Sequence, residues 1–165
     1  MALLNDLKAQ QEKPKLAANK SDLWLTYKGE GSPGKGKHVV LIAADQEYRS
    51  EQSMPMLAKI LSKHHGFDCT VLFSVNEKGE VDPTMPAPFK DKTKRHNIPG
   101  LGHLAKADCV IWLSRFMHLP QDQMQHFHDY FDSGKPLIAL RTANHGFWGG
   151  VGYKKGGKNV SLRQM

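Results

Sequence analysis

Short, nearly continuous apolar runs with amphipathic segments between them are the feature that most limits the fold of this chain. Runs of this length suit parallel strands that are covered on both faces. They predict four strands, at residues 37–44, 68–74, 109–113 and 137–140. No run approaches the ~20 apolar residues that cross a bilayer, so we expect no membrane partner.

Helical periodicity fills the gaps between these strands. Residues 53–65 present one apolar helical face, and Gly66 is a natural stop. A second helix opens at Pro120 and ends at Gly134, and a short one is expected at 101–106. Strands that alternate with helices predict an α/β fold with a doubly wound, mainly parallel sheet.

The two ends of the chain differ from its centre. Residues 1–36 are expected to form an N-terminal arm and linker, with one apolar island at 23–27 that packs on the domain. The α/β domain itself is expected at 37–165, and it is predicted to be partial and truncated at its C-terminus. The reason is that 148–165 hold many glycines and lysines and no clear helix. Residues 1–12 lack the basic-then-apolar order of a signal peptide, which leaves the localisation open.

A net charge of +7, from 23 basic and 16 acidic residues, raises the question of a nucleic-acid partner. The basic residues are scattered, with local clusters only at 90–95 and 154–158. Neither cluster forms a stripe on a helix or carries an RNA-binding aromatic motif. We interpret them as a solvated surface without a specific nucleic-acid partner, and weak, salt-sensitive adhesion to polyanions stays open.

The chain contains partial matches to cofactor-binding and metal-binding motifs, but no complete motif. Gly29, Gly31 and Gly34 match a dinucleotide fingerprint, yet the loop precedes a strand instead of opening a helix. We therefore interpret it as a linker and expect no cofactor. His126 and His128 are two residues apart on a helix and point to different faces, so no metal site is expected.

Polar side chains follow three of the predicted strands at the point where each strand ends. In open α/β sheets, ligands bind outside these carboxyl ends. We hypothesise that the three turns form a site for a polyol or sugar, with His145 as general acid or base and Glu47 as the second catalytic candidate. The substrate-binding candidates are Asp45, Tyr48, Arg49, Arg115, Arg141 and Asn144. The competing interpretation is structural: Arg115 and Arg141 pair with Asp45 or Glu47 and hold the loops together.

At these residues the chain resembles the ThuA-like (trehalose utilisation) family of the class I glutamine amidotransferase-like superfamily, in particular its planctomycete-type bacterial branch. Segments 34–73, 97–136 and 137–147 carry the resemblance, and DQEYRSEQ and LRTANHGF are its most specific parts. The resemblance implies a flavodoxin-like three-layer sandwich and a role in carbohydrate metabolism. Relatives are often exported and usually continue beyond the length of this chain.

Amidotransferase activity is not expected despite the superfamily resemblance. A glutamine amidotransferase places a nucleophilic cysteine in the turn after a central strand. The corresponding turn here reads Leu140-Arg141-Thr142-Ala143 and contains no cysteine. The leading hypothesis is a domain that binds or processes a saccharide, trehalose or another disaccharide. The alternative is a non-catalytic interaction module of a larger protein, and the sequence leaves both catalysis and oligomeric state open.

Overall fold

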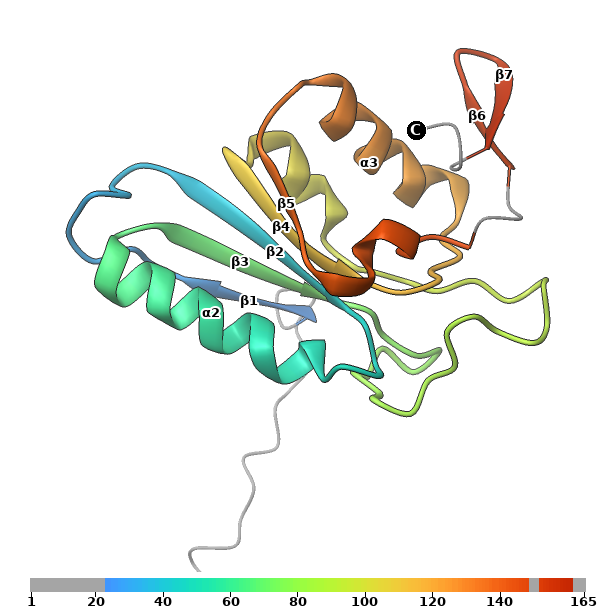
Figure 1. Cartoon of the computed structure of the whole chain (residues 1–165), viewed down its shortest axis with the longest axis horizontal. Coiled ribbons are helices and arrows are strands. Elements are labelled where there is room, and N and C mark those ends of the chain that lie inside the picture. The colour runs from blue at the N-terminus through green and yellow to red at the C-terminus, as the bar shows by residue number, and fades with distance from the viewer. Residues whose placement is uncertain (1–22, 149–151, 162–165) are drawn as a thin grey trace, which may run out of the picture.

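The predicted apolar runs form the parallel part of a five-stranded sheet with the strand order β1-β3-β2-β4-β5 (Figure 1). The strands are β1 (Trp24–Tyr27), β2 (His38–Ala44), β3 (Asp68–Phe73), β4 (Cys109–Ser114) and β5 (Leu137–Ala139). Strands β2 to β5 run parallel, and β1 pairs antiparallel with β3. The predicted α/β class with a mainly parallel sheet is therefore confirmed.

The computed structural model describes residues 23–148 and 152–161. Most of the predicted N-terminal arm, residues 1–22, lies outside the described residues, as does the end of the tail at 162–165. The apolar island predicted to pack on the domain forms β1 at the edge of the sheet, where Trp24 packs against the core.

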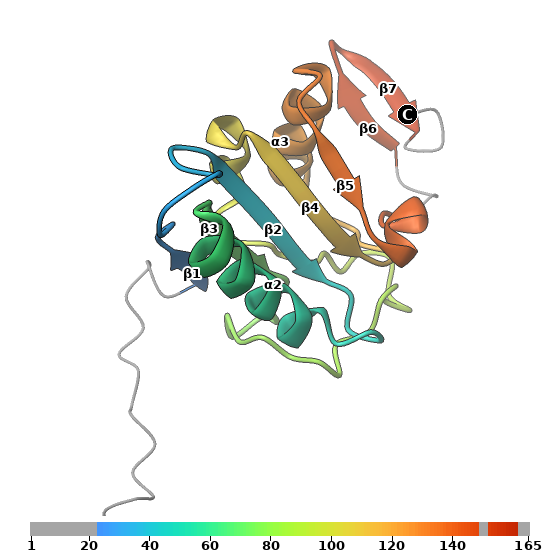
Figure 2. The ribbon, with the colours of Figure 1, turned by 60° about the vertical axis from the view of Figure 1, so that its left-hand side comes forward.

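Helices cover the two faces of the sheet, as Figures 1 and 2 show. One face is covered by α2 (Ser50–His65), and the other by α3 (Gln121–Asp132) with the 3-10 helix η2 (Leu101–Lys106). The helix predicted to begin at residue 53 begins three residues earlier, because Ser50 donates to the backbone oxygen of Asp45 through both its N–H and its hydroxyl. The predicted stop at Gly66 is confirmed: its φ of 76° is left-handed, and its N–H caps the last turn.

Alternate residues of β2 enter two different cores, which explains why its sequence is apolar throughout. Leu41 and Ala43 pack on the side of α2, whereas Val40 and Ile42 pack on the side of α3. All four side chains are at most 4% exposed. A strand covered on both faces has no position at which a polar side chain would reach water.

The C-terminal part of the chain contains a hairpin that the sequence analysis missed. Strands β6 (Gly152–Lys155) and β7 (Lys158–Ser161) pair antiparallel around Gly156 and Gly157, which both have positive φ. A Gly-Gly pair between two short strands is a signal for a two-residue hairpin turn. The backbone of Lys154 exchanges two hydrogen bonds with the side chain of Gln121 at the start of α3.

Candidate functional site

The carboxyl ends of β2, β4 and β5 lie at one edge of the sheet, which Figure 2 shows as three arrowheads pointing the same way. Parallel pairing places Ala44 beside Ser114, and Trp112 beside Ala139. The turns that follow these strands, at 45–49, 115–118 and 141–145, therefore come together, and we call them the rim. The last turn includes the 3-10 helix η3 (Arg141–His145).

Asp45 is the first residue of the rim turn after β2 and is fully buried. One carboxylate oxygen accepts hydrogen bonds from the backbone N–H groups of Glu47 (3.1 Å) and Tyr48 (3.2 Å). The other oxygen accepts a short hydrogen bond from the hydroxyl of Thr142 in η3. Asp45 was a substrate-binding candidate, and the structure places it as the link between the first and third turns.

The side chains of Glu47, Arg115 and His145 form one continuous patch on the rim. The Glu47 carboxylate lies 2.7 Å from the guanidinium of Arg115, which also donates to the backbone oxygen of Ala87 at 3.3 Å. The guanidinium carbon of Arg115 lies 5.1 Å from the centre of the Phe116 ring. That ring in turn lies 4.8 Å from the imidazole of the exposed His145. The structure thus brings together the three side chains on which the sugar-site hypothesis depends.

The remaining candidates divide between this patch and its surroundings. Arg141 stacks on the ring of Tyr48, with its guanidinium carbon 4.0 Å from the ring centre. Asn144 is exposed on η3 beside His145. Arg49 instead pairs with Glu51 at the start of α2, at 2.6 Å. The structural interpretation therefore accounts for Arg115, which pairs with Glu47, but not for Arg141, which stacks on Tyr48 instead of pairing with Asp45 or Glu47. Asn144 and His145 are exposed to solvent.

Each of the three rim turns contains a non-glycine residue with positive φ. These residues are Arg49 (54°), Phe116 (48°) and Arg141 (46°), and they are the only ones of their kind among the described residues. Such conformations cost of order 1–3 kcal/mol each and cluster at active sites and ligand clamps. Arg141 lies between β5 and the rest of η3. A sharp turn from a strand into a helix can hold the side chain at the turn, here that of Arg141, out from the sheet edge.

A buried histidine that the sequence analysis did not select ties the long loop at 75–100 to the rim. The Nδ1 atom of His96 accepts from the backbone N–H of His118 at 2.9 Å, and its Nε2 lies 3.0 Å from the backbone oxygen of Pro86. The imidazole stacks on Phe89, with ring centres 4.2 Å apart. The sequence of this loop has no repeating pattern, so no single residue in it stood out.

These contacts make the stability of the fold sensitive to acid. Burial lowers the pKa of His96, and the pKa of His118 is lowered by burial and then by the charge of Arg95. The unfolded chain, with histidine pKa values of about 6.5, therefore binds more protons below neutrality than the folded chain does. We expect the urea concentration at the unfolding midpoint to decrease when the pH is lowered from 7.5 to 5.5.

A variant separates His96 from the other titrating groups. His96→Gln should be less stable than the wild type at pH 7.5 but lose less stability on acidification. His64→Gln, at the exposed end of α2, controls for the loss of one histidine. An equal pH dependence in all three proteins would contradict the role given to His96.

Among residues 23–148 and 152–161, the structure shows no group of three or more His, Cys, Asp or Glu side chains that could hold a metal ion. The helices within these residues are all too short or too polar to span a bilayer. Cys69 and Cys109 are free thiols on β3 and β4, the strands that flank β2.

Comparisons of the chain with family models, with curated proteins and with solved structures found no match. The function proposed below therefore rests on the side chains of the rim and on the resemblance of the segments that carry them.

Proposed function

We propose that this chain is a ThuA-like domain, with a flavodoxin-like three-layer sandwich, that binds or processes a saccharide at its rim in carbohydrate utilisation. The observation that carries the proposal is the continuous patch formed by Glu47, Arg115, Phe116 and His145. It combines hydrogen-bonding groups for vicinal hydroxyls with aromatic rings for the apolar face of a sugar. A trehalose-type disaccharide is the substrate class that the family resemblance suggests.

The ion pair between Glu47 and Arg115 is weak enough for both side chains to bind a ligand instead of each other. The side chain of Glu47 is 50% exposed and that of Arg115 is 29% exposed. Ion pairs this open contribute little to stability, typically about 0–1 kcal/mol. A diol that bridges the carboxylate and the guanidinium therefore replaces a weak contact with several charge-assisted hydrogen bonds.

His145 is the group of the patch best placed for proton transfer. Its ring packs against Phe116 on one side and is otherwise exposed, so it can approach a bound hydroxyl or glycosidic oxygen. Histidine is the most frequent general acid or base in enzymes that work near neutral pH. Glu47 is the second group of the patch that can accept a proton, and it would do so after releasing Arg115.

Thermal unfolding in the presence of trehalose, maltose and glucose tests the proposal. A saccharide at a hundred times its Kd should stabilise the wild type by about 2.7 kcal/mol, which is several degrees in Tm. Glu47→Gln removes the carboxylate of the patch and should weaken binding at least tenfold. Lys37→Gln breaks another ion pair, to Asp108 at 3.0 Å, at the opposite edge of the sheet and should leave binding unchanged.

The alternative function, an interaction module, is supported by the exposed edge strand β5. Leu137 and Ile138 are 39% and 49% exposed, which is unusual for apolar residues of a sheet. Unpaired strand edges can pair with a strand of another protein. A wild type that responds to no saccharide, or a Glu47→Gln variant that binds like the wild type, would favour this module over the sugar site.

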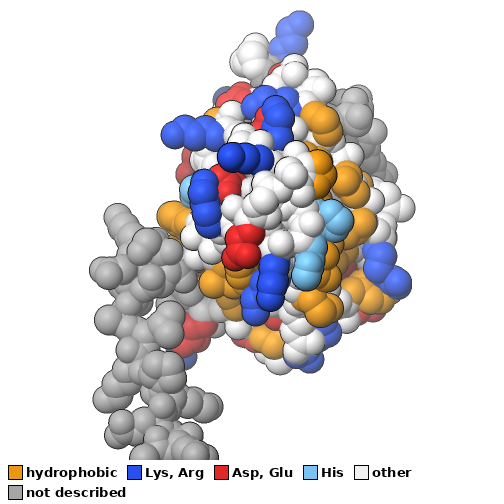
Figure 3. All heavy atoms as spheres, turned by 90° about the vertical axis from the view of Figure 1, so that its left-hand side faces the viewer, with side chains coloured by type: hydrophobic (Ala, Val, Ile, Leu, Met, Phe, Trp, Pro, Cys, Tyr) orange, Lys and Arg blue, Asp and Glu red, His pale blue; other side chains and the backbone are white. Residues whose placement is uncertain are grey.

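The surface charge gives less support to a polyanion partner. On the face seen in Figure 3, Lys and Arg side chains lie among acidic, histidine and apolar side chains and form no continuous stripe. Polyanion binding through such a surface would collapse with modest salt, whereas saccharide binding at the rim would not.

A further inference from the structure

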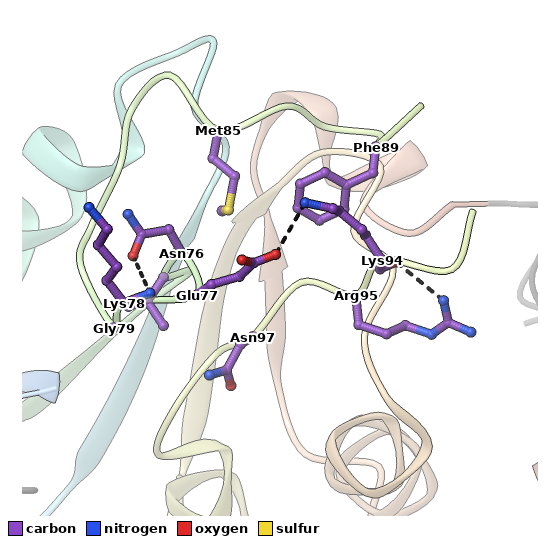
Figure 4. A pocket seen from close by; sticks show the side chains of 10 residues that line it. Asn76, Glu77, Lys78, Gly79, Met85, Phe89, Lys94, Arg95 and Asn97 are labelled. Carbon is purple, nitrogen blue, oxygen red and sulfur yellow. Dashed lines mark hydrogen bonds and ion pairs between the residues drawn. The ribbon is translucent and has the colours of Figure 1, made fainter. Parts of the chain in front are cut away.

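The long loop that follows β3 borders an open cavity that is separate from the rim. The cavity has a volume of about 580 Å³ and is lined by residues between Val75 and Asn97 (Figure 4). Small-molecule sites typically measure about 300–1,000 Å³. The segment from Met85 to Phe89 divides the two sites, because Ala87 contacts Arg115 of the rim while Met85 and Phe89 line the cavity.

Apolar side chains form one part of this cavity. Val75 and Met85 are only 3% and 7% exposed, and in Figure 4 the thioether of Met85 points into the hollow. The ring of Phe89 is held in place by its stacking on the buried His96, 4.2 Å away. A fixed aromatic ring beside an adaptable methionine suits a flat apolar body.

Positive charge dominates the polar part of the cavity. Lys78, Lys94 and Arg95 line it together with one carboxylate, that of Glu77. Lys94 and Arg95 belong to the basic cluster at 90–95, which the rim does not use. Three cations against one carboxylate suit a dianion better than a monoanion.

Lys94 is the cation that a ligand can most readily recruit. Its ammonium lies 3.1 Å from the Glu77 carboxylate, and this contact spans the hollow in Figure 4. The two side chains are 51% and 86% exposed, so the pair is easily broken. The Arg95 guanidinium, in contrast, already donates to the backbone oxygens of residues 92, 93 and 94.

We propose that this cavity binds an aromatic phosphate monoester. The aromatic ring packs against Met85 and Phe89, and the phosphate displaces Glu77 from Lys94. Both halves of the ligand are needed, because the apolar wall gives no charge selectivity and lysine binds phosphate as a point charge without fixing its orientation.

Isothermal titration calorimetry with three probes tests both halves: 1-naphthyl phosphate, 1-naphthol and inorganic phosphate. We expect 1-naphthyl phosphate to bind at least tenfold more tightly than either of the others. Lys94→Gln should weaken its binding at least fivefold, and Glu77→Gln, which releases Lys94, should tighten it at least twofold. Lys92→Gln makes the same charge change on the same loop but outside the cavity lining, and it should stay within twofold of the wild type.

All three substitutions are on exposed residues, so each variant is expected to keep the wild-type Tm. A Tm measurement therefore shows whether a change in affinity comes from the cavity or from a loss of stability. Two results would overturn the proposal. The first is equal binding of inorganic phosphate and 1-naphthyl phosphate, and the second is an equal loss in Lys92→Gln and Lys94→Gln. Either result would show that the probes bind to the general positive charge of the loop and not to a specific site in the cavity.

Discussion

Asp45→Ala is expected to lower the free energy of unfolding by about 3 kcal/mol. The buried carboxylate accepts three hydrogen bonds, and hydrogen bonds to charged groups contribute roughly 1.5–3 kcal/mol each before the cost of burying the charge is subtracted. The substitution also detaches η3 from the turn after β2, so the patch of Glu47 and Arg115 should lose its position. Urea unfolding with an unchanged m-value measures the effect.

Two further substitutions show which part of the Asp45 network matters. Thr142→Val keeps the shape of the side chain but leaves one carboxylate oxygen without its donor, and it should cost about 1–2 kcal/mol. Asp45→Asn retains an acceptor for the two backbone N–H groups and should cost less than Asp45→Ala. Thr93→Val removes a similar hydroxyl hydrogen bond, to the exposed Asp91, and should have no measurable effect. A loss in Thr93→Val as large as that in Thr142→Val would contradict the link between the turns.

The strands β2, β3 and β4 were predictable because their burial on both faces leaves a local signature. Every residue of β2 after His38 is buried, and the apolar run in the sequence has nearly the same bounds as the strand. The start of α2 was predicted less well. The apolar periodicity predicted a start at residue 53, whereas the true start depends on hydrogen bonds to Asp45, which belongs to the preceding turn.

The rim was predictable as a location but not as a set of contacts. Parallel topology alone brings the turns after β2, β4 and β5 to one edge, so the proximity of Glu47 to Arg115 follows from the pattern of elements. Which arginine pairs with which partner depends on backbone conformation. The positive φ of Arg49 and Arg141 leaves no trace in the sequence, because neither residue is one that favours the left-handed region.

The burial of His96 could not be predicted either. Its partners, the backbone groups of Pro86 and His118, lie 10 and 22 residues away and come together only in the folded loop. Backbone groups are the same at every position, so the sequence cannot mark them as partners. The cavity at 75–97, which uses the same loop, was therefore visible in the sequence only as an unusually long loop with a basic cluster.

The glycines at 29, 31 and 34 were interpreted as a flexible linker, and the structure gives two of them a different role. The chain at Gly29 passes directly against the C-terminal end of α2. The N–H of Gly29 donates to the carboxylate of Asp68 at 2.8 Å, and the next N–H, of Glu30, donates to the backbone oxygen of Ser62 at 3.0 Å. Gly34 likewise donates to the backbone oxygen of His65 at 2.7 Å. Gly29 and Gly34, which match a nucleotide motif in their spacing, thus allow the backbone before β2 to pack closely against the backbone at the end of α2.

Gly29→Ala should therefore cost about 3 kcal/mol of stability, at the upper end of the usual range for overpacking. A methyl group on Gly29 would lie 2.2 Å from the backbone oxygen of Gly66 and 2.8 Å from the carbonyl carbon of Phe67. Neither atom can retreat without breaking the hydrogen bonds that Gly66 and Phe67 donate to the last turn of α2.

Gly31→Ala is the matched control, because its φ of 83° is left-handed but, among the described residues other than its chain neighbours, no atom lies within 4 Å of the added methyl group. Its cost should be about 1–2 kcal/mol, the penalty of a left-handed alanine. Urea midpoints of the two variants separate close packing from backbone strain. Equal losses of stability in the two variants would mean that the segment before β2 can shift to make room for the methyl group. Its glycines would then serve as a flexible linker, as the sequence predicted.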